Sequence, residues 1–262
     1  MKLKSNAKIN LSLKIIGKEN GYHLIDSIFV PINIYDDIEI IEHNCDVIEG
    51  MDISINDNII YKAICLIRNE YNIKKHFKVV IDKIIPVQAG LGGGSSNAAM
   101  TLKILNKMLG LNLSNERLVE LGLLLGSDVP FFIYNKPSNV YGRGEIIKPI
   151  DNFGRLYGVL VFDDMYFSTK NVYDTYDHLV DNKLIGDFGL NNDLEIAARK
   201  MQDGNKIELI ENDLISNGAY TASLTGSGGS IFGLFRSEQE ANDAEKKLKD
   251  KYKFVHSFVS IE

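Results

Sequence analysis

Four of the five residues from Gly90 to Gly94 are glycine, and this run separates a predicted strand from a predicted helix. Glycine has no Cβ, so the backbone amides of such a loop can approach a ligand closely. A helix that begins directly behind the loop offers unpaired N–H groups and a positive dipole end, which favour phosphate. Ser95 and Ser96 add hydroxyls for a phosphate oxygen or a magnesium ion. The segment predicts a phosphate-binding loop, and the alternative is a turn that only joins a strand to a helix.

The better-known phosphate motifs do not fit this segment. Walker A needs Gly-Lys-Ser/Thr, and the dinucleotide fingerprint needs a glycine where Ser95 stands. Asp187-Phe188-Gly189 spells a protein-kinase triplet, but no His-Arg-Asp or Val-Ala-Ile-Lys accompanies it, so we interpret it as chance. A second glycine-rich stretch, Thr225–Ser230, lies between two short predicted strands, where a hairpin turn would need fewer glycines. Two loops of this type strengthen the prediction of a phosphate-bearing ligand.

Two ionisable residues are candidates for chemistry, although each has an ordinary structural interpretation. Asp128 follows Gly126 and Ser127 at a predicted helix end, where an aspartate often serves as a turn or capping residue. Lys8 lies on the polar face of the first predicted strand, where most lysines are solvated. Asn10 shares that face. The residues alone leave both interpretations open.

Hydrophobic periodicity predicts mixed helices and strands around these residues. Apolar residues alternate from Ala7 to Ile15, the period of a half-buried strand, and a turn at Glu19-Asn20-Gly21 follows it. Further strands are predicted over 22–41, 77–85, 157–162, 220–224, 230–235 and 254–260, and helices over 58–67, 95–109, 114–126, 169–181, 193–202, 206–217 and 237–251. The order predicts an α+β protein with two closely packed domains, residues 1–150 and 151–262.

The amino-acid composition limits the classes of partner that this protein is expected to bind. The formal net charge is -6 and the sequence pI is about 5.5, so neither nucleic acid nor an anionic membrane is an expected partner. Two cysteines without Cys-x-x-Cys spacing argue against a disulfide framework or a zinc site. No run of residues is apolar enough for a membrane span or a signal-peptide core. We expect a cytoplasmic protein, monomer or homodimer, that acts on small molecules.

Four motifs in order support a more specific interpretation. Pro86–Ala99 resembles the central motif of the GHMP kinases, which include galactokinase, homoserine kinase and mevalonate kinase. Leu224–Gly228 is similar to the third motif of these kinases. Lys8–Leu11 with Gly21–His23, and Gly126–Phe132, resemble the members that phosphorylate 4-diphosphocytidyl-2-C-methyl-D-erythritol in the non-mevalonate isoprenoid pathway. The resemblance covers about residues 7 to 235 and implies the two-domain GHMP fold, with the active site in the interdomain cleft.

The resemblance also implies a reaction and a role for each motif. ATP would be the co-substrate with Mg²⁺, no permanent metal site would be needed, and the acceptor would be the 2-hydroxyl. Asp128 would be the general base and Lys8 its electrostatic partner. The implied ATP-binding residues are Pro86, Val87, Gln88, Ala89, Gly90, Leu91, Gly92, Gly93, Gly94, Ser95 and Ser96. The implied substrate-binding residues are Asn10, Tyr22, His23, Thr169 and Tyr173, with Gly226, Ser227 and Gly228 in the third-motif loop.

Two other functions remain as alternatives. Another GHMP kinase, such as homoserine kinase, would have no use for the aromatic clamp around cytosine that the resemblance assigns to Tyr22, His23 and Tyr173. A nucleotide-binding module without catalysis would be expected to lack Lys8 or Asp128, and the sequence has both.

Overall fold

The structure is a computed structural model that describes residues 1–182 and 191–262, so the triplet Asp187–Gly189 lies outside the described residues. Helices and strands contribute in mixed order, as an α+β protein requires. The described elements, in chain order, are β1 (Lys2–Glu19), β2 (Tyr22–His43), β3 (Val47–Glu49), α1 (Ile59–Glu70), β4 (His76–Asp82), α2 (Gly93–Met108), α3 (Asn115–Leu123), α4 (Val129–Tyr134), β5 (Ser138–Gly142), β6 (Ile146–Pro149), β7 (Tyr157–Phe162), α5 (Thr169–Asp181), α6 (Glu195–Ala198), α7 (Asn205–Ser216), β8 (Thr221–Leu224), β9 (Ser230–Phe235), α8 (Glu238–Leu248) and β10 (Phe254–Val259).

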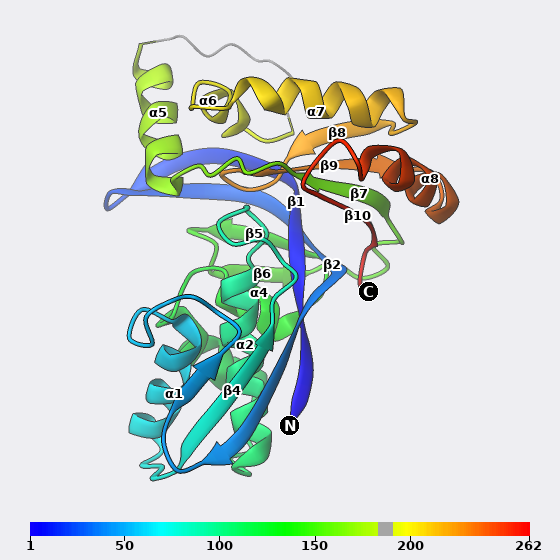
Figure 1. Ribbon diagram of the computed structural model, residues 1–262. Helices are drawn as coiled ribbons and strands as arrows, with labels where there is room; N and C mark the ends of the chain where they lie inside the picture. Colours follow the sequence, from blue (N-terminus) through cyan, green and yellow to red (C-terminus); the bar gives the residue numbers. More distant parts are fainter. Residues whose placement is uncertain (183–190) are drawn as a thin grey trace.

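The strands form two sheets among the described residues (Figure 1). The first has the order β3-β4-β2-β5-β6, and β1 pairs with β2 in addition. The second has the order β10-β7-β9-β8, and all of its pairs are antiparallel. Strand β7 is a continuous apolar run, and Val159, Leu160 and Val161 are completely buried. Both of its faces are covered, which explains why the strand shows no polar alternation.

The long β1–β2 pair connects the two halves of the molecule. Asn20 and Gly21 join the strands, with φ of 50° and 82°, the left-handed conformation that a two-residue hairpin turn requires. Apolar residues of this pair, such as Ile9 and Val30, share one core with Leu160 and Phe232 of the second sheet. The first strand therefore carries its motif residues to the junction of both sheets (Figure 1).

Most predicted elements are confirmed, and the differences have local causes. Side-chain caps begin four helices, among them the predicted cap Ser114 before α3. Helix α2 starts two residues earlier than the predicted Ser95, and α6 is shorter than the predicted 193–202. The sequence analysis missed β3, α4, β5 and β6, all of which are six residues or shorter. No helix within residues 1–182 and 191–262 is long and apolar enough to cross a membrane.

Lys103 on α2 is a partly buried cation whose ammonium donates to the carbonyl of Phe132 at 3.2 Å. Burial lowers its pKa to about 8. In the unfolded chain the pKa is about 10.5, so between pH 8 and 10.5 the unfolded state binds more protons and wild-type stability rises with pH. Lys103→Met removes this titration. We expect the variant to be more stable below pH 8 by about 2 kcal/mol, an advantage that shrinks towards pH 10.

Urea unfolding of both proteins at pH 7.5 and pH 10 measures this difference. Lys107→Met, which replaces an exposed lysine on the same helix, is the matched control and is expected to change the free energy of unfolding little. A Lys103→Met advantage of equal size at both pH values would contradict the expectation.

Candidate active site

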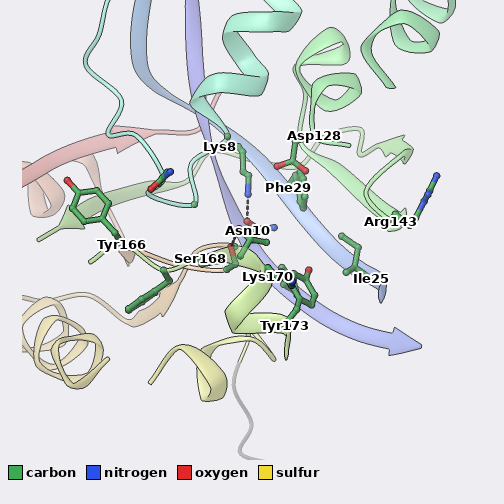
Figure 2. A pocket seen from close by; sticks show the side chains of 18 residues that line it. Lys8, Asn10, Ile25, Phe29, Asp128, Arg143, Tyr166, Ser168, Lys170 and Tyr173 are labelled. Carbon is green, nitrogen blue, oxygen red and sulfur yellow. Dashed lines mark hydrogen bonds between the residues drawn. The ribbon is translucent and has the colours of Figure 1, made fainter. Parts of the chain in front are cut away.

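A cavity of about 660 Å³ lies where β1, the two glycine-rich loops, the start of α4 and the start of α5 meet (Figure 2). It is lined by two predicted catalytic residues, Lys8 and Asp128. Other predicted residues that line it are Asn10, Gln88, Gly90, Gly92, Thr169, Tyr173, Gly226 and Ser227. The fold thus collects residues from four separate motifs around one space.

Lys8 is almost fully buried, and its ammonium donates to the side-chain oxygen of Asn10 at 2.5 Å (Figure 2). It also lies 4.7 Å from the centre of the Phe29 ring, a favourable position for a cation. Burial lowers the pKa of Lys8, and the negative charge of Asp128 opposes that shift. The charge of Lys8 therefore depends on Asp128, and the two residues form an electrostatically coupled pair.

Asn10 connects the first motif to the third. Its backbone N–H donates to the Thr225 hydroxyl at 2.9 Å, and that hydroxyl donates to the Asn10 side-chain oxygen at 3.2 Å. The Asn10 amide also donates to Ser27 at 3.2 Å. Asn10 is consequently held on three sides, and through it the position of the Lys8 ammonium is fixed.

The two glycine-rich loops contact each other directly. Ser230 donates its backbone N–H to the carbonyl of Ala89 at 3.1 Å. A Cβ on Gly90 would lie 2.4 Å from the Thr225 carbonyl oxygen, and its φ of 78° also favours glycine. Gly90 is therefore required for the close approach of the two loops. The sequence analysis predicted that both loops bind one ligand but did not predict that they contact each other.

A second cavity of about 340 Å³ lies on the other side of the first glycine-rich loop. All residues from Pro86 to Ser95 line it, while Gln88, Gly90 and Gly92 line both cavities. Ser96 was predicted to bind ATP, but its side chain is fully buried and accepts a hydrogen bond from Ser5 at 2.7 Å. Ser95 lines the cavity and Ser96 holds α2 to β1.

Asp128 precedes α4 at the N-cap position, yet its side chain makes no capping hydrogen bond. The capping interpretation of this aspartate is therefore not what the structure shows. Its carboxylate lies at the cavity instead, where a Cβ on Gly144 would be 3.7 Å from Oδ1. Burial, together with the charge of Asp128, raises the pKa of the Tyr173 hydroxyl to about 12. Tyr173 thus lies within electrostatic range of Asp128 and stays neutral.

The three predicted cytosine-binding residues are only partly brought together. The His23 ring packs on the Tyr173 ring with 4.6 Å between centroids, and its Nε2 lies 2.6 Å from Asp177. Tyr22 is 57% exposed and lines a smaller cavity of about 270 Å³ with Arg143. The guanidinium of Arg143 lies 4.8 Å from the centre of the Tyr22 ring.

The sequence analysis missed several residues that line the larger cavity. Arg143 stands between two glycines in the β5–β6 turn, and Lys170 lies in the first turn of α5. Lys170 places a positive charge in the first turn of a helix, where it opposes the helix dipole, and Arg143 places one in a tight turn between glycines. Both placements are unusual for a purely structural cation, so the sequence could have marked these residues as candidates. Phe29 and Tyr166 also line the cavity, but their sequence surroundings give no such signal.

Comparison with known proteins identifies the family to which this fold belongs. The model of the GHMP kinase N-terminal domain matches residues 58–136, and that of the GHMP kinase C-terminal domain matches residues 190–253. A solved structure of a 4-(cytidine 5'-diphospho)-2C-methyl-D-erythritol kinase has a TM-score of 0.85 at 23% identity and covers all of both chains. The mevalonate kinase of Methanococcus jannaschii has a TM-score of 0.70 at 17% identity, over 100% of this chain and 98% of that one.

The curated relatives are closer in sequence. A 4-diphosphocytidyl-2-C-methyl-D-erythritol kinase of Clostridium tetani is 36% identical over the full length of both chains. One of Clostridium botulinum is 38% identical over 96% of this chain and 97% of its own. The chain belongs to the GHMP kinases. Within them its family is that of the 4-diphosphocytidyl-2-C-methyl-D-erythritol kinases, as the sequence analysis predicted.

Proposed function

We propose that the protein transfers the γ-phosphoryl group of ATP to the 2-hydroxyl of 4-diphosphocytidyl-2-C-methyl-D-erythritol. One observation carries the proposal: a single cavity contains Asp128 and the buried Lys8 and shares Gly90 and Gly92 with the cavity of the phosphate-type loop. A phosphoryl-transfer enzyme needs an acceptor site and a donor site that meet at the transferred group. The two cavities meet in this way at the loop.

Asp128 accepts the proton of the acceptor hydroxyl in this mechanism. Its carboxylate is free of a capping bond and lies on the cavity, so a hydroxyl can reach it. The ammonium of Lys8 stabilises the negative charge that develops on the attacking oxygen. Its rigid hydrogen bond to Asn10 holds that charge in place before the reaction, which is how positioned charges lower a barrier.

The triphosphate of ATP binds over the first glycine-rich loop and the N-terminus of α2. The helix starts at Gly93, so its unpaired N–H groups and positive dipole end face the loop. Ser95 is the hydroxyl that lines this cavity. Mg²⁺ would arrive with the nucleotide and neutralise phosphate charge. Among the described residues, no group of three His, Cys, Asp or Glu side chains is arranged to hold a metal ion.

The acceptor's cytosine binds beside the hairpin end of β1 and β2. Tyr22 offers an exposed ring there, and Asp177 fixes the orientation of His23 against Tyr173. Lys18 also pairs with Asp177, at 2.6 Å. Thr169 contacts Ser227 at 2.9 Å, which joins the start of α5 to the third-motif loop beside the acceptor. We further propose that the two domains meet near residue 150, between β6 and β7, where one sheet ends and the other begins.

A coupled assay for ADP release tests the proposal with three acceptors. We expect turnover with 4-diphosphocytidyl-2-C-methyl-D-erythritol and a much smaller rate with homoserine or mevalonate. Product analysis should show one new phosphate ester at the 2-position. Preferred turnover of homoserine would establish the alternative kinase, and the binding of ATP without turnover of any acceptor would favour a non-catalytic module.

Tyr22→Ala is expected to raise KM for the cytidylylated acceptor about tenfold to a hundredfold and to leave KM for ATP nearly unchanged. Stacking on one aromatic ring contributes roughly 1–3 kcal/mol, and a base far from the transferred group is bound equally in ground and transition states. Such a loss appears in KM more than in kcat. Steady-state kinetics with each substrate varied in turn measures it.

Tyr220→Ala is the matched control, since Tyr220 is similarly exposed at 53% but lines none of the three cavities described above. It should behave as wild type. If Tyr22→Ala weakened the binding of ATP rather than that of the acceptor, Tyr22 would be assigned to the donor site.

A further inference from the structure

Arg143 occupies a position that connects two cavities. It lies in the β5–β6 turn between Gly142 and Gly144, whose φ values of 69° and 110° favour glycine, and a Cβ on Gly144 would lie 3.7 Å from Asp128 Oδ1. Arg143 is the one residue common to the 660 Å³ cavity around Asp128 and the 270 Å³ cavity beside Tyr22, among the cavities of the described residues. Figure 2 shows it at the edge of the larger cavity, on the side away from Tyr166.

The guanidinium of Arg143 retains most of its capacity for an anion. Its Nε lies 4.0 Å from a carboxylate oxygen of Glu145, and the side chain is 52% exposed. An ion pair of this length and exposure contributes little stability. The other carboxylate oxygen of Glu145 accepts the backbone N–H of Arg143 at 2.5 Å, so Glu145 is occupied by the turn itself. The positive charge is therefore available to a ligand between the two cavities.

The acceptor of the proposed reaction has its charged part in the corresponding place. Cytosine is at one end, the polyol with the reacting hydroxyl is at the other, and a ribose followed by a diphosphate joins them. With cytosine at Tyr22 and the hydroxyl at Asp128, the diphosphate must pass the boundary between the cavities. We infer that Arg143 binds this diphosphate and so selects acceptors that carry it. The inference rests on the proposed function, whose acceptor it uses.

A purely structural role for Arg143 makes a different prediction. Because the guanidinium lies over the Tyr22 ring, its loss would disturb that ring and weaken cytidine and cytidine diphosphate alike. Loss of a phosphate contact would instead weaken only the diphosphate, since arginine binds phosphate through charge-assisted hydrogen bonds that cytidine cannot make. The comparison of the two ligands separates the roles.

Calorimetry measures binding of cytidine and of cytidine diphosphate to the wild-type protein, Arg143→Met and Arg143→Lys. Saturating ADP is present to occupy the donor loop, so that only the acceptor side is titrated. For Arg143→Met we expect a tenfold to hundredfold weaker affinity for cytidine diphosphate and less than a threefold change for cytidine. Arg143→Lys should recover part of the loss because it keeps the charge. KM for the full acceptor should rise in parallel, with kcat changed less.

Lys148→Met is the matched control. Lys148 also lies over a tyrosine ring, 5.4 Å from the centre of Tyr141, on the neighbouring strand and outside the described cavities. It should bind both ligands as wild type does. Equal weakening of both ligands in Arg143→Met, or no weakening of either, would overturn the inference while acceptor turnover by the wild type still supported the proposed function. A wild-type protein that phosphorylates only an acceptor without cytidine would overturn both.

Discussion

Asp128→Asn is expected to lower kcat about a hundredfold to ten-thousandfold while ATP affinity stays close to that of the wild type. Asparagine keeps the volume of the side chain and removes only its ability to accept a proton, which accounts for losses of this scale. Because Asp128 makes no capping hydrogen bond to α4, the substitution removes no helix contact. Single-turnover kinetics gives the rate of phosphoryl transfer, and calorimetry gives the ATP affinity.

The coupling of Asp128 to Lys8 sharpens the test. The carboxylate is the group that opposes the lowering of the Lys8 pKa by burial, so Asp128→Asn should also lower the protonated fraction of Lys8 at high pH. Lys8→Met and Asp128→Asn should therefore not be additive, and the double variant should be little slower than the slower single one.

The matched control for this prediction is Asp151→Asn, an exposed aspartate in the turn after β6 that lines neither cavity. It should keep full activity. Normal turnover by a correctly folded Asp128→Asn protein would remove Asp128 from the mechanism and leave Lys8 without its partner.

Gly94→Val is expected to weaken ATP binding by about a hundredfold or more without loss of folding. Gly94 lies in the first turn of α2 and lines the donor cavity. A Cβ there would meet only Ile59 Cγ2, at 3.9 Å, so the folded protein accommodates it. Valine has a higher helix propensity than glycine, so α2 itself should not suffer. The added methyl groups instead fill space that the phosphates need.

Gly17→Val provides a matched control in β1. A Cβ on Gly17 would also have one neighbour, Leu24 Cδ1, at 3.9 Å, and Gly17 lines none of the cavities described above. Calorimetric titrations with ATP and with ADP, and thermal unfolding, are carried out on both variants. ATP and ADP affinities of wild-type strength in folded Gly94→Val would mean that the loop only connects β4 to α2.

The sequence determined those features that depend on neighbouring residues. The Asn20-Gly21 turn, the cap at Ser114 and the strand–loop–helix around Gly92 follow from local backbone preferences, so their prediction was confirmed. Strand β7 was predicted from a continuous apolar run, which is typical of a strand that is covered on both faces. By contrast, α4 and the β5–β6 hairpin are too short for their periodicity to be distinguished from a loop, and Arg143 was missed along with them.

Tertiary structure decided which residues come together in the candidate site. Asn10 and Thr225 are 215 residues apart and share two hydrogen bonds, and Lys8 comes under the charge of Asp128 only when β1 packs beside the start of α4. The sequence shows Lys8 on the polar face of a strand, and only the folded chain, which places Phe29 and Gly92 against this side chain, buries it and lowers its pKa. Local patterns specify which face of an element is polar. Which other element covers that face, and so which charges lose water and meet, depends on the packing of all elements together.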